Sequence, residues 1–142
     1  MIIAFWEIRI SSGVIFGELQ SAERRRTMRK KNYKGKCEKR SLSKGYDVIR
    51  TYDEIQYAYA DVLQNNDNIK EIRCNVLLDG LQDGEYTSDF VCVKVDNDLM
   101  VRECVQRKYL TKPMTIKLLD ASRNFWLRHG VTDWGLVIDA EE

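Results

Sequence analysis

Apolar residues recur with two different periods along this chain, and each change of period marks the border of a predicted element. In residues 51–64, an apolar stripe at helical spacing, typical of an amphipathic helix, is formed by Ile55, Tyr59, Val62 and Leu63, with Tyr52 and Ala58. Apolar side chains recur with a similar spacing in residues 115–129, shortly after the only proline of the chain. We therefore predict two helices, over residues 51–64 and 115–129.

Strands are predicted where apolar residues alternate with polar ones, or form short runs, between turn-forming residues. In one such stretch Ile72, Cys74, Val76 and Leu78 occupy every second position, so we expect them on one face of a strand. The predicted strands cover residues 69–78, 86–95, 99–106 and 134–138. The second and third are expected to form a hairpin. The order helix, three strands, helix, strand predicts an α/β fold, a small mixed β-sheet flanked by helices.

The chain divides into three predicted segments. In residues 1–22 apolar and polar residues alternate weakly, which is compatible with a hairpin around Ser11–Gly13. A strongly basic stretch separates these residues from the rest of the chain. We therefore expect an N-terminal appendage (1–27), a basic arm (28–50) and a folded domain (51–142), with the chemistry in the last.

Charge is distributed unevenly, which changes the expectation about partners. Residues 24–44 hold eleven basic residues and one acidic residue, so the rest of the chain carries −9 although the total is +1. A basic arm on an acidic body favours a polyanion such as DNA; the alternative is a solvated linker. The candidate DNA-binding residues are Arg24, Arg25, Arg26, Arg29, Lys30, Lys31, Lys34 and Lys36.

Composition argues against several other classes of protein. No apolar run approaches the roughly 20 residues that span a bilayer, and the short apolar start lacks the features of a signal peptide. The four cysteines have no C-x-x-C spacing and the single histidine is remote from them, which argues against zinc. We expect a cytoplasmic protein without membrane contact.

Two acidic residues lie inside the predicted hairpin, each among apolar neighbours. Asp89 is followed by Phe90-Val91-Cys92-Val93, and Glu103 lies between Val101 and Cys104. A carboxylate buried in a strand is costly unless it is hydrogen-bonded, paired or bound to a metal. Two of them on neighbouring strands predict a divalent-cation site for phosphodiester chemistry.

Glu54 is the third candidate ligand, because its helix can pack across the sheet and bring it to the other two acids. Mg²⁺ or Mn²⁺ held by Glu54, Asp89 and Glu103 would activate water and stabilise charge on phosphate. Each acid also has a structural explanation. Glu54 could form a capping box with Thr51. Asp89 could be a buried hydrogen-bond acceptor, and Glu103 could form an ion pair with Arg102 or Arg107.

The chain order of these acids fits the PD-(D/E)xK nuclease plan, and residues 51–139 resemble the catalytic domain of TnsA, a transposon-end endonuclease. The resemblance rests on TYDEIQYAYADVLQNNDNIKEIR, YTSDFVCV and TIKLLDASRNFWLRHGVTDWGLVID in this order. It implies a restriction-endonuclease-like fold with Glu54, Asp89 and Glu103 as metal ligands. The family has a lysine two positions after the last acid, where this chain has Val105. Arg107 or Lys108 is the candidate replacement, and Lys112 a further one.

The resemblance implies a Mg²⁺-dependent DNA endonuclease subunit that acts beside a DDE transposase subunit and an ATPase regulator. It would hydrolyse a phosphodiester at the transposon end. The alternative is a catalytically inactive nuclease-fold module that binds DNA or a protein of a mobile element or phage. Val105 favours this alternative.

Overall fold

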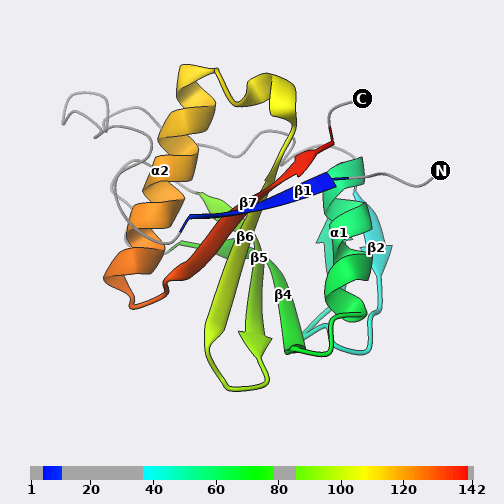
Figure 1. Cartoon of the computed structure of the whole chain (residues 1–142). Helices are drawn as coiled ribbons and strands as arrows, with labels where there is room; N and C mark the ends of the chain where they lie inside the picture. The colour runs from blue at the N-terminus through cyan, green and yellow to red at the C-terminus, as the bar shows by residue number, and fades with distance from the viewer. Residues whose placement is uncertain (1–4, 11–36, 79–85, 141–142) are drawn as a thin grey trace.

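A five-stranded mixed sheet lies between two helices (Figure 1). The computed structural model describes residues 5–10, 37–78 and 86–140, with side chains from residue 37 onward. In spatial order the strands are β1 (Phe5–Ile10), β7 (Asp133–Asp139), β6 (Leu99–Val105), β5 (Thr87–Lys94) and β4 (Ile69–Leu77). The helices are α1 (Glu54–Gln64) and α2 (Pro113–Arg128). The predicted small mixed sheet flanked by helices is confirmed.

Strand direction follows from the connections. β4, β5 and β6 form an antiparallel meander, and α2 then carries the chain back so that β7 pairs with β6 in parallel. At the β5–β6 turn, Asn97 adopts a positive φ of 73°, a conformation that asparagine tolerates better than most residues. The predicted hairpin and the predicted order of elements are therefore both confirmed.

The first strand has a partner that the sequence pattern did not predict. β1 runs antiparallel to β7, with Phe5 opposite Asp139 and Ile10 opposite Trp134. Among the strands that the structure describes, it thus lies at the edge of the main sheet. Residues 11–22, the rest of that predicted hairpin, lie outside the described residues.

A second, smaller sheet lies within and after the predicted basic arm. It consists of β2 (Glu38–Arg40) and β3 (Ile49–Thr51), paired antiparallel. The buried side chain of Ile49 belongs to the core beneath α1, so this ladder is packed against the domain. The last part of the predicted arm is therefore folded structure.

Two apolar clusters fill the space on the two faces of the main sheet. On one side Ile55, Tyr59 and Leu63 of α1 pack with residues such as Phe90 and Met100 of the sheet. On the other side α2 packs against the sheet; the members of this cluster include Val91, Val101, Val105, Leu119, Phe125, Trp126, Trp134 and Leu136. The predicted inner faces of both helices are confirmed at these positions, but Val62, which was also predicted to lie on the inner face of α1, is 43% exposed.

The start of α1 differs from the predicted capping box. Asp53, not Thr51, is the N-cap: its Oδ1 accepts a hydrogen bond of 2.8 Å from the backbone N–H of Gln56. Gln56 reaches back, and its Oε1 accepts a bond of 2.7 Å from the N–H of Tyr52. The capping role proposed for Thr51 and Glu54 is therefore wrong, because Thr51 belongs to β3 and the helix begins three residues later.

β4 does not keep one face throughout its length. Asn75 has a positive φ of 51°, which rotates the strand locally. As a result Ile72 and Cys74 pack on the α1 side, whereas Val76 and Leu78 pack on the α2 side. The predicted single face over Ile72–Leu78 is wrong at this point, since strict alternation requires extended backbone at every residue.

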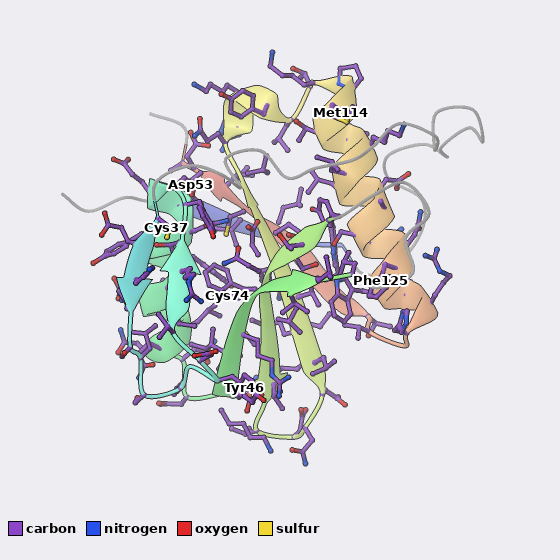
Figure 2. The ribbon with its side chains drawn as sticks, turned by 180° about the vertical axis from the view of Figure 1, so that it is seen from behind. Cys37, Tyr46, Asp53, Cys74, Met114 and Phe125 are labelled. Carbon is purple, nitrogen blue, oxygen red and sulfur yellow. The ribbon has the colours of Figure 1, made fainter. Side chains whose placement is uncertain are left out.

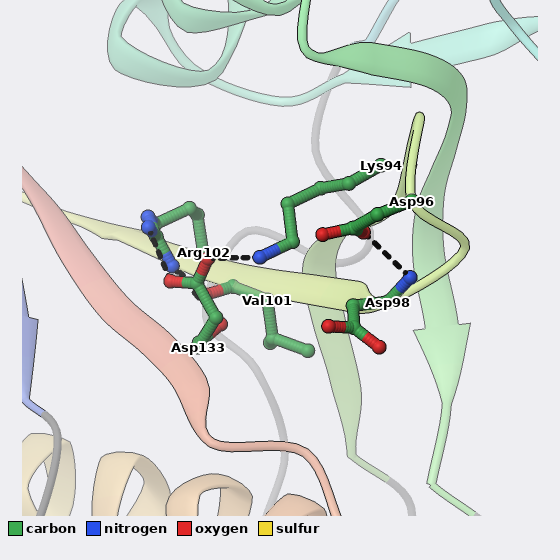
Figure 3. Close-up of polar contacts among 6 residues, drawn as sticks. All are labelled: Lys94, Asp96, Asp98, Val101, Arg102 and Asp133. Carbon is green, nitrogen blue, oxygen red and sulfur yellow. Dashed lines mark hydrogen bonds and ion pairs between the residues drawn. The ribbon is translucent and has the colours of Figure 1, made fainter.

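An ion-pair network joins the ends of β5, β6 and β7 (Figure 3). The Arg102 side chain is 0% exposed and donates to Asp133 Oδ1 at 2.7 Å, while Lys94 Nζ lies 3.0 Å from Asp133 Oδ2. Burial alone would raise the pKa of Asp133, but the hydrogen bonds from Arg102 and Lys94 outweigh it and lower this pKa.

Asp133→Asn is expected to lower the free energy of unfolding at pH 7 by about 3 kcal/mol, because it leaves the buried Arg102 charge without its carboxylate. The pKa of Asp133 is lowered in the folded state, so its contribution is full above the unfolded pKa of about 3.9. That contribution is lost as the pH falls through the lower folded pKa. Urea unfolding between pH 7 and pH 2 measures this: the difference between wild type and variant should shrink below about pH 4. A difference independent of pH would contradict the assignment.

None of the four cysteines, all within the described segments, forms a disulfide. In the part of the chain that the structure describes, no helix is long and apolar enough to cross a membrane.

Candidate functional site

Asp89 and Glu103 lie where β5 and β6 stop pairing. The regular ladder between these strands ends at Phe90 and Arg102, although β6 stays paired with β7 as far as Val105. The next positions along the two strands are Asp89 and Glu103. We refer to these two residues as the carboxylate pair.

Asp89 uses its side chain where a backbone carbonyl would otherwise continue the ladder. Its Oδ2 accepts a hydrogen bond of 2.7 Å from the backbone N–H of Cys104 on β6. Its Oδ1 accepts a hydrogen bond from Nε2 of Gln56 on α1. Both carboxylate oxygens therefore accept hydrogen bonds from protein donors. The residue is only 2% exposed, so this site is shielded from water.

Glu103 makes the reciprocal contact. Its Oε1 accepts a bond of 2.9 Å from the backbone N–H of Asp89, so each acid of the pair holds the main chain of the opposite strand. Hydrogen bonds between backbone donors and carboxylates are among the stronger ones in proteins. The pair therefore connects β5 to β6 across the opening where the regular ladder has ended.

The second oxygen of Glu103 lies in a cluster of polar groups on the α2 side. Oε2 accepts bonds from the hydroxyls of Ser88 at 2.7 Å and Ser122 at 2.5 Å. These hydroxyls in turn accept from the indole N–H groups of Trp126 and Trp134, at 2.9 and 3.1 Å. Glu103, which is 1% exposed, is thus the acceptor at the centre of a buried network.

Tyr86 shows the electrostatic effect of this network. Burial raises the pKa of its hydroxyl well above the ordinary value, and the negative charge of Glu103 raises it further. The hydroxyl therefore stays protonated and can donate toward Glu103 throughout the neutral range.

The two carboxylates face different helices. Asp89 is bonded to Gln56 of α1, and Glu103 is bonded to Ser122 of α2, on the opposite face of the sheet. Within residues 37–78 and 86–140, no three His, Cys, Asp or Glu side chains are grouped so that they could hold a metal ion. The metal-binding role of Glu54, Asp89 and Glu103 stays a prediction.

Glu54 is apart from the carboxylate pair. It is exposed at the first helical position of α1, and Gln56, two residues later, is the side chain that reaches Asp89. Sequence reasoning missed Gln56 because an amide is not a typical ligand of a catalytic metal. The available signal was its position three residues after the N-cap Asp53, which directs the side chain back toward the sheet.

The cations expected to replace the family lysine leave the strand. β6 ends at Val105, and Arg107 and Lys108 belong to a 3-10 helix (Arg107–Tyr109), so Arg107 does not lie on a strand face with Glu103. The backbone N–H of Arg107 donates to Asp139 at 2.5 Å, and the ammonium of Lys108 lies over the ring of Tyr109. Val105 itself is buried in the α2-side core.

The basic arm is described only at its end. The eight candidate DNA-binding residues between Arg24 and Lys36 lie outside the described residues. Further on, Arg40 is held by α1, where it pairs with Asp61 and lies over the ring of Tyr57. Lys44 Nζ donates to the carbonyl of Asn66 at 2.6 Å.

Comparison with known proteins adds no further constraint. No family model matches the sequence, and no curated protein matches it.

Proposed function

We propose that this chain is a nuclease-fold module that binds DNA and does not hydrolyse it. The observation that carries this proposal is the saturation of the carboxylate pair: both oxygens of Asp89 and both oxygens of Glu103 accept hydrogen bonds from protein donors. The two acids therefore have a sufficient structural role as connections between β5, β6 and the helices.

A metal would have to displace these donors. Mg²⁺ requires near-ideal octahedral oxygen ligands and gives up its water reluctantly, so it favours carboxylates that are open to solvent. Asp89 and Glu103 are almost fully buried and face different helices. An amide, Gln56, lies against Asp89, and Val105 supplies no positive charge beside Glu103. All of these features favour binding without hydrolysis.

DNA is the proposed partner because of the basic residues that precede and enter β2. The eleven basic residues between 24 and 44 suit a phosphate backbone, and the order of elements agrees with the nuclease plan that the TnsA resemblance implies. On that resemblance, the proposed setting is a mobile element in the cytoplasm, beside a DDE transposase subunit and an ATPase regulator.

A second candidate is the Mg²⁺-dependent endonuclease itself. One observation favours it: Asp89 and Glu103 occupy neighbouring positions at the point where two central strands separate. The backbone N–H of Asp89 donates a hydrogen bond to Oε1 of Glu103. Hydrolysis would require Asp89 to release Gln56 and Glu103 to leave its serine donors. The first proposal needs no such rearrangement, and it is the one we adopt.

A plasmid assay separates the two candidates. Wild-type protein is expected to bind supercoiled plasmid and so to slow its migration in a gel. It should not nick the plasmid at about 1–10 mM Mg²⁺ or Mn²⁺, either alone or with a DDE transposase subunit. Asp89→Asn serves as the comparison, with its fold verified by circular dichroism. Nicking by the wild type that the Asp89→Asn protein lacks would support the endonuclease and overturn the first proposal.

A further inference from the structure

Two exposed basic residues face each other on the outer side of the β2–β3 ladder. Lys39 on β2 is the cross-strand partner of Arg50 on β3, so both side chains project from the same face. Both are exposed, whereas the neighbouring Arg40 turns inward and pairs with Asp61 of α1. Like charges directly opposite each other destabilise a ladder, which makes this arrangement costly for the protein alone.

No acidic side chain compensates this pair of charges in the part of the chain that the structure describes. The ion pairs seen there involve Arg40, Arg73, Lys94 and Arg102, and neither Lys39 nor Arg50 is among them. An external anion would reduce the repulsion between these two side chains.

The same surface continues to β4 and to an exposed aromatic ring. The backbone of Arg50 is hydrogen-bonded to Cys74 and Asn75, the two residues that follow Arg73 on β4. Arg73 in turn lies over the ring of Tyr46, 3.9 Å from its centre, and Tyr46 is 64% exposed. In Figure 2 the β2–β3 ladder lies in front of α1, and Tyr46 is labelled at the lower end of β4.

We infer that this surface, formed by Lys39, Arg50, Arg73 and Tyr46, is a contact site for a DNA strand. Lys39 and Arg50 would neutralise neighbouring phosphates, and the open face of the Tyr46 ring would stack on an unpaired base. The basic residues of the arm precede β2 in the sequence. The inference rests on the proposed DNA-binding function and adds a folded site to the arm.

The test compares two double variants with equal loss of charge. Lys39→Ala with Arg50→Ala is the test protein, and Lys70→Ala with Arg128→Ala, which removes two exposed basic residues outside this surface, is the control. Affinity for a fluorescent single-stranded 20-mer and for its duplex is measured by anisotropy at several salt concentrations. The test protein should bind about tenfold more weakly than the control. The slope of its log affinity against log salt concentration should become shallower by about 2.

Tyr46→Ala provides the second measurement. It should weaken binding of the single strand by about tenfold and leave the duplex nearly unchanged, since stacking requires an unpaired base. Equal loss on both substrates overturns the stacking role. The melting temperature of the Lys39/Arg50 variant should not fall, because the substitutions remove a repulsion.

The outcomes also separate this inference from the proposed function. If the wild type binds DNA and the Lys39/Arg50 variant matches the Lys70/Arg128 control, the surface is not a contact site, while DNA binding stands. If the wild type binds neither substrate, the proposed function fails together with this inference.

Discussion

Glu103→Ala is expected to lower the free energy of unfolding by about 3–5 kcal/mol, the largest effect of any single substitution that we predict outside the apolar core. The change removes the acceptor of the Ser88 and Ser122 hydroxyls and of the Asp89 backbone N–H. It also leaves a cavity between the sheet and α2. Urea unfolding followed by tryptophan fluorescence measures the loss, since Trp126 and Trp134 adjoin the network.

Two comparison variants make this prediction specific. Glu103→Gln keeps the shape and one acceptor oxygen, so we expect a smaller loss of about 2 kcal/mol. Glu54→Ala alters an exposed residue at the start of α1 and should change stability by less than about 0.5 kcal/mol. If Glu103→Ala were as stable as Glu54→Ala, the structural role of the carboxylate pair would be refuted.

Gln56→Glu is expected to have the second largest effect, because it sets a carboxylate against Asp89 in a site that is almost fully buried. We expect a loss of about 3 kcal/mol at pH 8 in the absence of metal. The measurement is the melting temperature with and without Mn²⁺. Two adjacent carboxylates form a cation site, so millimolar Mn²⁺ should recover most of the loss in the variant.

The pH dependence of this variant has a defined sign. Two acids in contact share a proton, which raises the folded-state pKa of the pair above the unfolded value of about 4. The stability of the folded variant is then greatest below that unfolded value and falls as the pH rises through the folded pKa. The deficit relative to wild type should therefore be small near pH 4 and largest at pH 8. A constant deficit, with no recovery by Mn²⁺, would mean that residue 56 does not adjoin Asp89.

The elements of the fold could be predicted from local patterns. The helical spacing of Ile55, Tyr59 and Leu63 predicted the buried face of α1, and turn residues predicted the β5–β6 hairpin. These features depend on neighbours in the sequence. The pairing of β1 with β7 joins residues from the two ends of the chain, and no local pattern encodes it.

The identity of the buried acids could be predicted, but not their directions. Apolar neighbours correctly indicated that Asp89 and Glu103 are buried. Alternation along regular strands made them appear to share one side of the sheet. The β5–β6 ladder ends after Phe90, and the side chain of Asp89 turns to α1 instead. Such local twists arise from tertiary packing, which a single sequence does not display.

The role of Gln56 could not be predicted either, because it too arises from tertiary packing. Its distance from Asp89 in the sequence is 33 residues, and the contact exists only because α1 crosses the sheet at this point. Sequence reasoning identified the right helix but selected Glu54, since a carboxylate is the expected ligand for a divalent cation.

Titration of wild-type protein with Mn²⁺, followed by isothermal calorimetry and by the electron paramagnetic resonance signal of free Mn²⁺, tests the central claim most directly. The account predicts no stoichiometric binding up to millimolar metal, because protein donors already occupy the oxygens of Asp89 and Glu103. Binding of one Mn²⁺ per chain that disappears in the folded Asp89→Asn variant would contradict it.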